Sequence, residues 1–333
     1  MFSSRWKRGA SAVAITASLA LALAACTSNT PDKTTSSGSL TTLKVATIGL
    51  TSDGSLINGI NKGFFEKNGL KIETSVVANP PAGLAAVQSG QVDIAYTPSI
   101  PLLNALANGV SVKVIGAADG FSSADVAAKD PGEFDDTGLF ASPKSGVTSV
   151  KELAGKTIAV PARNAQMEVV ISDVLKRSGV DPKGINWVIL DFTSAVAALK
   201  NGTVAAAGLV NPFTSEAENA GATKLSSPSI AFFGEGAVGL WVTGSNTLTS
   251  NKAHIVAFQK ALKESNAYAN AHPKEAIKAG LAYTKSILTV DQVAVPYWPA
   301  EVKQSNLSNV NQKLVDLGFL KSLVNLNGVI FKG

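Results

Sequence analysis

Four short loops of this sequence combine hydroxyl, amide and charged side chains, and each loop lies between an apolar strand-like run and a helix-like run. They are Thr51-Ser52-Asp53, Thr97-Pro98-Ser99, Ala162-Arg163-Asn164 and Asn211-Pro212-Phe213. In open α/β sheets, ligands bind beyond the carboxyl ends of the strands, where helix N-termini present free backbone N–H groups. The residue types predict non-covalent capture of a small polar solute.

Arg163 bears on the charge of that solute. It is the only basic side chain in the four loops, and a helix N-terminus already favours an anion. A small organic anion such as a sulfonate is therefore the favoured solute. Asp53, in another of the loops, would repel such an anion.

Aromatic and amide side chains support a different class of solute. Phe121 and Phe213 would stack on a neutral or heteroaromatic ring, and Asn164 and Asn211 would supply amide contacts. Helix capping is a structural alternative for several of the polar residues, and it is compatible with ligand contact. The residues with this alternative are Thr51, Ser52, Ser99 and Asn164.

The sequence offers little for catalysis. Cys26 is the only cysteine, and His254 and His272 are the only histidines, so the chain has no internal disulfide and no thiolate or His-rich metal site. It contains no Gly-x-Ser-x-Gly elbow, no phosphate loop and no metal-ligand spacing. We expect a protein that is not an enzyme and that has no catalytic residues, no metal and no cofactor.

The N-terminus has the three parts of an export signal. Arg5, Lys7 and Arg8 precede an apolar run, and the run ends in Leu23-Ala24-Ala25-Cys26. The pattern resembles a bacterial lipoprotein signal peptide (residues 1–25), with Cys26 as the acylated new N-terminus and a lipid anchor on the extracytoplasmic face of the cell membrane. The alternatives are a membrane-spanning helix, for which the run is short, and a plain secretory signal with a free thiol.

A polar segment at residues 26–42 follows, and it has the Ser, Thr, Pro and Gly content of a flexible tether. The formal net charge of the chain is +5, and it falls to +2 when the three basic residues of the signal leave. The mature chain therefore lacks the positive charge that nucleic-acid binding needs.

Strand-like and helix-like runs alternate through the remaining chain, which predicts parallel sheets with crossover helices. The expected strands are 43–48, 70–77, 92–96, 110–116, 156–160, 185–190, 204–209 and 237–243. The expected helices are 55–68, 82–88, 100–107, 165–178, 194–200, one starting at 211–213, 252–271, 273–283, 290–295 and 307–317. Residues 84–92 also align with 196–204, which indicates two similar lobes.

Several segments resemble the periplasmic-type solute-binding proteins of ABC importers, in particular the nitrate, sulfonate and taurine group, which includes pyrimidine-precursor binders. The segments are 65–70, 89–95, 150–160, 258–262 and 271–276. The resemblance implies an α/β, two-lobe, type II fold, in which each lobe is a mainly parallel sheet flanked by helices. It also implies two hinge crossings, near 138–143 and 237–243, with lobe I at 43–140 and 237–333 and lobe II at 141–236.

The resemblance implies a monomeric receptor that captures a small solute by hinge closure and delivers it to ABC permease subunits. Sulfonate, taurine or nitrate is the favoured class, and a pyrimidine or thiamine precursor is the alternative. A lipid-anchored solute sensor is a further alternative. The interval 121–136 is more acidic than this group leads us to expect, and its acidity would act at the cleft entrance.

The anchor is testable by replacing its cysteine. In cells that express the full chain, Cys26→Ser should move the protein from the membrane fraction to the soluble fraction, because the thiol that carries the lipid is gone. Fractionation and intact mass measure this. A variant that stays in the membrane with an unchanged mass would contradict the anchor.

Overall fold

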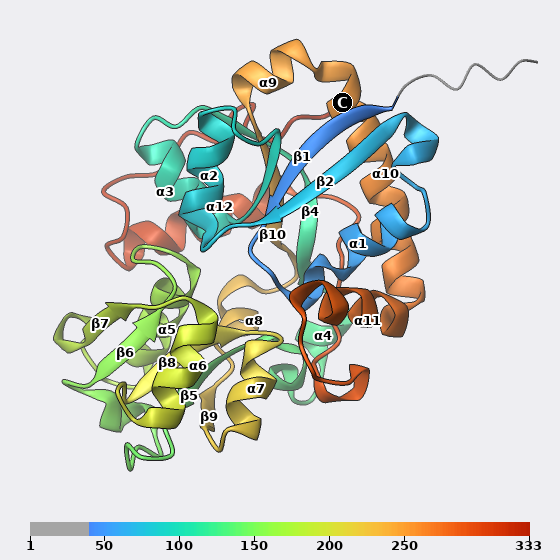
Figure 1. Ribbon diagram of the computed structural model, residues 1–333. Helices are drawn as coiled ribbons and strands as arrows, with labels where there is room; N and C mark the ends of the chain where they lie inside the picture. The colour runs from blue at the N-terminus through green and yellow to red at the C-terminus, as the bar shows by residue number, and fades with distance from the viewer. Residues whose placement is uncertain (1–39) are drawn as a thin grey trace, which may run out of the picture. The chain divides into compact units, whose positions relative to one another are not determined.

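The computed structural model describes residues 40–333 as two lobes, each built on a five-stranded mixed sheet (Figure 1). The predicted signal peptide, Cys26 and nearly all of the predicted tether lie outside the described residues. Among residues 40–333, every helix is too short or too polar to span a bilayer.

The sheet of the first lobe has the strand order β2-β1-β3-β10-β4. Strand β1 is parallel to β2 and β3, whereas β10 is antiparallel to both of its neighbours. The strands are β1 (Thr41–Thr47), β2 (Leu70–Val76), β3 (Ile94–Pro98), β4 (Val112–Phe121) and β10 (Gly236–Gly244). A late part of the chain therefore completes the first lobe, as the resemblance implied.

The sheet of the second lobe has the order β7-β6-β8-β5-β9. Here β6 is parallel to β7 and β8, and β5 is the antiparallel strand. The strands are β5 (Thr137–Ala141), β6 (Thr157–Val160), β7 (Asn186–Ile189), β8 (Ala206–Val210) and β9 (Thr223–Ser226). Taken in order, the two sheets match strand for strand, and the two copies of the internal repeat lead into β3 and β8, which hold the same central position.

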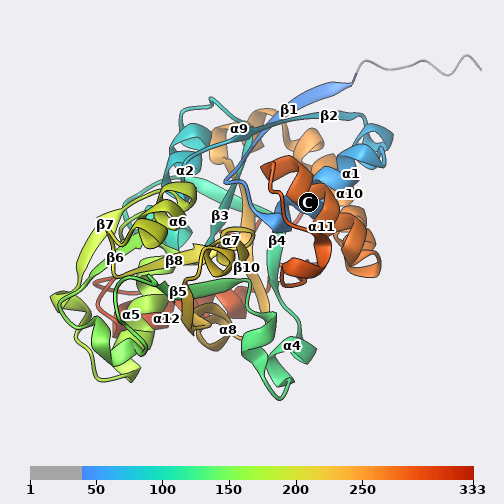
Figure 2. The same ribbon diagram turned by 60° about the horizontal axis from the view of Figure 1, so that its bottom comes forward.

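Helices cover both sheets (Figures 1 and 2). They are α1 (Gly54–Asn61), α2 (Pro80–Gln88), α3 (Ser99–Ala107), α4 (Ser123–Ala127), α5 (Gln166–Arg177), α6 (Phe192–Asn201), α7 (Phe213–Asn219), α8 (Pro228–Phe233), α9 (Ser245–Ser250), α10 (Lys252–Ala271), α11 (Pro273–Thr284) and α12 (Gln304–Asp316). Local signals set several boundaries: Asn79 caps α2 through the N–H of Ala82, and left-handed Gly202 ends α6.

The crossings between the lobes differ from the expected positions. Residues 138–141 belong to β5 in the second sheet, and 237–243 belong to β10 in the first. The chain therefore crosses before each of these strands, between β4 and β5 and between β9 and β10. Buried strands have the same apolar residue pattern in either sheet, so the sequence could not show to which sheet each strand belongs.

Three elements also differ from the prediction. The helix expected at 55–68 ends at Asn61, because the chain turns and Gly63 takes a φ of 74°. Residues 290–295 hold only a 3-10 turn, Val290–Gln292. Strand β4 continues past Gly116 to Phe121, because β10 pairs with it over that length although Asp and Gly disfavour strands.

Helices α1 and α11 approach each other through glycine. A Cβ at Gly280 would lie 2.2 Å from the carbonyl oxygen of Thr51, and one at Gly54 would lie 1.9 Å from that of Ala276. Backbone cannot yield at such distances. This contact holds the Thr51 loop against the C-terminal half of the chain.

Gly280→Ala should therefore destabilise the protein by about 1 to 3 kcal/mol through overpacking, although helix propensity alone predicts stabilisation by about 1 kcal/mol. Urea unfolding measures the change. Gly184→Ala is the control, because nothing lies within 4 Å of a Cβ there. Equal stability of the two variants would show that the close approach does not constrain the fold.

Candidate functional site

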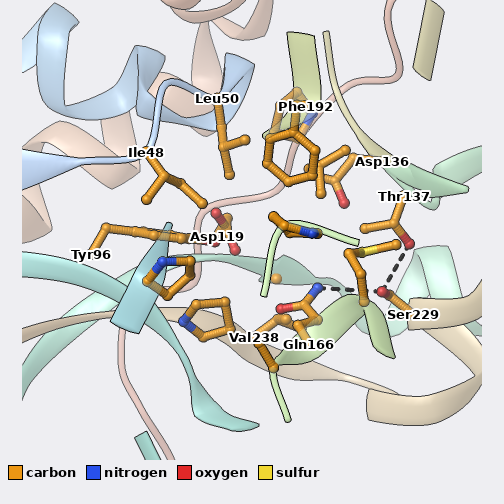
Figure 3. A pocket seen from close by; sticks show the side chains of 18 of the residues that line it. Ile48, Leu50, Tyr96, Asp119, Asp136, Thr137, Gln166, Phe192, Ser229 and Val238 are labelled. Atoms are coloured by element: carbon orange, nitrogen blue, oxygen red, sulfur yellow. Dashed lines mark hydrogen bonds between the residues drawn. The ribbon is translucent and has the colours of Figure 1, made fainter. Parts of the chain in front are cut away.

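A cavity lies between the two sheets at the carboxyl ends of several parallel strands (Figure 3). Its walls combine the first lobe (Ile48, Leu50, Pro80, Tyr96, Pro98, Asp119, Gly120, Phe121, Val238) with the first crossing, the second lobe and the C-terminal segment (Phe134, Asp136, Thr137, Pro161, Ala165, Gln166, Met167, Phe192, Val210, Ser229, Pro296). The cavity volume is about 40 Å³, which is room for a few waters only. The cavity in this conformation is too small for an organic solute.

Asp119 lies at the first-lobe side of the cavity and is only 7% exposed. Its carboxylate accepts hydrogen bonds from Ser52 Oγ at 2.8 Å and from the N–H of Gly239 at 2.9 Å. Burial raises the pKa of this carboxyl, and the Ser52, Tyr96 and Gly239 hydrogen bonds oppose the rise. A Cβ at Gly239 would lie 2.3 Å from Asp119 Oδ1 and 2.6 Å from Tyr96 Cε2, so only glycine leaves room for this arrangement.

Asp136 reaches the cavity from the end of the first crossing (Figure 3). Burial, and then the charges of Asp119 and Asp135, raise its pKa well above the usual range. No side chain of residues 40–333 donates a hydrogen bond to its carboxylate. Its backbone oxygen accepts a bond of 2.8 Å from the N–H of Asn211, which fixes the residue to the second lobe.

The neighbouring carboxylate has a different role. Asp135 accepts hydrogen bonds from the N–H groups of Ser229 and Ile230, at 2.8 and 2.9 Å, and from the Thr137 hydroxyl at 2.7 Å. It therefore ties the first crossing to the start of α8, which lies just before the second crossing. Asp135 therefore has a structural role in the crossing segment, whereas Asp136 lines the cavity.

The rest of the wall is aromatic and apolar. Tyr96, Phe121, Phe134 and Phe192 line it, and none of its lining residues is Lys, Arg or His. Phe192 is held by a stacked contact with Phe213, with ring centroids 5.2 Å apart. Within residues 40–333, no three side chains of the His, Cys, Asp and Glu types are grouped to hold a metal ion. The site is suited to a flat solute that is neutral or positively charged.

The structure brings few of the sequence-predicted residues to the cavity wall. Pro98 and Phe121 line it. Ser52 lies behind the wall and holds Asp119, while Asp53 accepts a hydrogen bond from the Leu50 N–H at 2.8 Å. Thr97 bonds to a backbone oxygen in its own loop. The hydroxyls of two others are buried without a hydrogen-bond partner among the described residues, namely Thr51 and Ser99.

Arg163 lies outside the cavity. Its guanidinium donates to Glu168 Oε1 at 2.8 Å, its side chain is 47% exposed, and Glu168 is 4% exposed. The carboxylate that pairs with Arg163 therefore belongs to α5, the helix that begins at Gln166. The adjacent Asn164 accepts a bond from Asn104 of the first lobe at 2.6 Å. The sequence argument for an anionic solute loses its one positive charge here.

The Asn211 loop meets the first lobe through its backbone. The Thr51 N–H donates to the carbonyl oxygen of Asn211 at 3.2 Å, and Asn211 Nδ2 reaches the carbonyl of Ala294 at 3.5 Å. Phe213 supports Phe192 from behind. The Thr51 and Asn211 loops therefore connect the two lobes and do not form the wall.

Sequence reasoning did not select several residues of the cavity wall, among them Asp119, Asp136, Gln166 and Phe192. The signal for Asp119 was the true end of β4, to which the carboxyl-end rule applies. The signal for Asp136 was the acidic interval 121–136. The sequence analysis predicted that this acidity acts at the cleft entrance, but it named no single residue. No local pattern distinguished Gln166 or Phe192.

A family model described as "NMT1/THI5 like" matches residues 53–276. The chain belongs to the NMT1/THI5-like family. Among its relatives, a "Putative thiamine biosynthesis protein" of Haemophilus influenzae is 26% identical over 67% of this chain and 66% of its own length. A Brachyspira hyodysenteriae protein is 30% identical over 75% of this chain and 72% of its own length, and is named "Putative ABC transporter periplasmic binding protein".

The fold has a solved counterpart in the alkanesulfonate-binding protein of Xanthomonas axonopodis pv. citri bound to MOPS. The TM-score is 0.70 over 89% of this chain and 100% of that chain, at 17% identity. This likeness establishes the periplasmic-binding-protein fold that the sequence resemblance implied. The family member described here is a periplasmic-type solute-binding protein, and such proteins work outside the cytoplasmic membrane.

The buried carboxyls make stability depend on pH. Burial, and to a lesser extent the charge of Asp119, raise the pKa of Asp53 from 3.8 to about 7, against the opposing Leu50 N–H. Between these values the folded state holds a proton that the unfolded chain has lost. Stability should therefore fall as pH rises from about 4 to about 7, by up to about 1.4 kcal/mol per pH unit for each such group.

Urea unfolding at pH 5 and pH 7.5 measures this dependence. Asp53→Asn should show a smaller loss between the two values, because the amide oxygen can still accept from Leu50 but cannot ionise. The carboxyls with lowered pKa, such as Glu73 and Glu275, act below about pH 4.5 and leave this window unaffected. Parallel pH profiles for the variant and the parent protein would contradict the assignment.

Proposed function

We propose that the protein is the extracytoplasmic receptor of an ABC importer and that it captures a neutral or cationic heteroaromatic solute, such as an aminopyrimidine of the thiamine-precursor type. The observation that carries the proposal is the cavity itself, where two carboxyl groups and four aromatic rings meet and no basic side chain lies on the wall. An anion placed there would either lie beside ionised carboxylates, which costs several kcal/mol, or require them to stay protonated, and no basic side chain on the wall would offset its charge.

Two relatives support the same choice. The Haemophilus protein is named for thiamine biosynthesis and the Brachyspira protein for an ABC transporter, so a pyrimidine solute and a permease partner are both consistent with the family. The sulfonate-binding structure shares only the fold at 17% identity, and fold does not fix the ligand. We therefore favour the heteroaromatic solute over the sulfonate, taurine or nitrate that Arg163 first favoured.

Capture would proceed by closure of the lobes. Residues from both lobes line the cavity, so a solute that contacts both adds binding free energy only to the closed state. Direct bonds between the lobes, such as Ser286 Oγ to Glu216 Oε1 at 3.1 Å and Asn104 to Asn164, would re-form at each closure. A lipid on Cys26 would keep a monomeric receptor beside its permease.

A thermal-shift screen tests the solute class. The purified mature chain is heated with aminopyrimidines, pyrimidinones, methanesulfonate, taurine and nitrate. A pyrimidine present at 100 times its Kd should raise the Tm by about 5 °C, because it stabilises the native state by about 2.7 kcal/mol. The anions should leave the Tm unchanged. A shift with a sulfonate or nitrate and none with any heteroaromatic compound would overturn the proposal.

A further inference from the structure

We propose that Asp136, together with Asp119 and Gln166, forms a subsite that binds a protonated amino group of the solute. The inference rests on the proposed function, since both place a solute in the same cavity. It adds which group of the solute is recognised, and by which protein atoms.

Three acceptors from three separate elements face this subsite (Figure 3). Asp119 comes from β4, Asp136 precedes β5, and Gln166 is the first residue of α5. Gln166 Oε1 is buried and has no hydrogen-bond partner among residues 40–333. A buried amide oxygen without a donor is costly, so this atom is an independent indication that a ligand supplies an N–H there.

The orientation of the Gln166 amide is fixed from behind. Its Nε2 donates to Ser229 Oγ at 3.4 Å. The same oxygen lies 2.8 Å from the Thr137 hydroxyl, whose one proton is donated to Asp135. The donor side of the amide is thereby used within the protein. The acceptor side is left for the solute.

The groups around Asp136 are mostly acidic. The titratable and charged groups that face it are Asp119 on β4, Asp135 in its own segment, Tyr96 on β3 and Lys224 on β9. Lys224 is exposed and does not line the cavity. Asp119 and Asp135 each accept hydrogen bonds from two or more protein donors, as described above, whereas Asp136 has no side-chain donor and accepts only from its own backbone N–H. A cationic N–H donor would supply the missing partner and offset the crowding of like charges.

Three pyrimidines that share one ring test the subsite by titration calorimetry: 5-(aminomethyl)pyrimidine, 5-(hydroxymethyl)pyrimidine and pyrimidine-5-carboxylate. At pH 7 the ammonium compound should bind at least about tenfold more tightly than the alcohol, and the carboxylate most weakly, as charge-assisted bonds require. Equal affinity for the ammonium compound and the alcohol would overturn the inference.

Asp136→Asn should lower affinity for the ammonium compound by about tenfold or more. Its affinity for the alcohol should stay within about threefold of that of the parent protein. Glu133 is an exposed acid in the same crossing. Glu133→Gln is therefore the control for net charge, and it should change the affinity for neither compound. Asp136→Asn should fold, because it removes one of several crowded carboxylates, and its Tm reports this.

Gln166→Met is a second variant. It should lower affinity for the ammonium compound more than affinity for the alcohol. Equal losses for both compounds in both variants would reduce the residues to a structural role.

The pH profile gives a readout that a structural role would not move. Affinity for the ammonium compound should fall from pH 7 to pH 5, by up to tenfold per unit, because a proton competes for Asp136. The affinity of the parent protein for the alcohol should change much less between pH 7 and pH 5. The affinity of Asp136→Asn for either compound should also change much less. If no compound of this series binds while another heteroaromatic in the screen does, the amino subsite is wrong and the proposed function stands. If only sulfonates or nitrate bind, both fail.

Discussion

The burial of a carboxylate at the end of β4 constrains much of the structure around the cavity. Asp119 can ionise there only while Ser52 Oγ and the N–H of Gly239 donate to it. These donors come from the first loop and from β10, which are far apart in the chain. Trp298, fully buried, adds the C-terminal segment, because its Nε1 donates to the carbonyl of Ser52 at 2.8 Å. One charge thus brings four segments together.

The second lobe contributes the complementary part of the site. Its crossing segment carries Asp136 beside the hinge residue Asp135, and α5 and α6 begin with Gln166 and Phe192. A solute that contacts all of these also bridges the lobes, so recognition and closure become one event. The alkanesulfonate-binding protein has the same arrangement of lobes. The charge of the residues at the strand ends, and not the fold, decides which solute such a cleft accepts.

Much of the fold was predictable, because periodicity and capping are local. The long helices α5 and α10 and the strands that alternate with helices were found within a few residues. The elements that escaped were the strands β5 and β9, the short helices α4, α8 and α9, and the end of β4. The two strands and the end of β4 are ordered by pairing with strands distant in sequence, which no local window contains. The helices are too short to give a periodic pattern.

The sequence by itself determined the two α/β lobes, the strand ends at which open α/β sheets bind ligands, and the lack of thiol or imidazole clusters. It could not determine which side chains at those ends face the cavity. Arg163 turned to Glu168 on the following helix, since a buried carboxylate needs a partner. Asp119 and Asp136 came to share one cavity only because β10 and the crossing segments folded around them. The sign of the charge in the cleft is therefore a property of the tertiary structure.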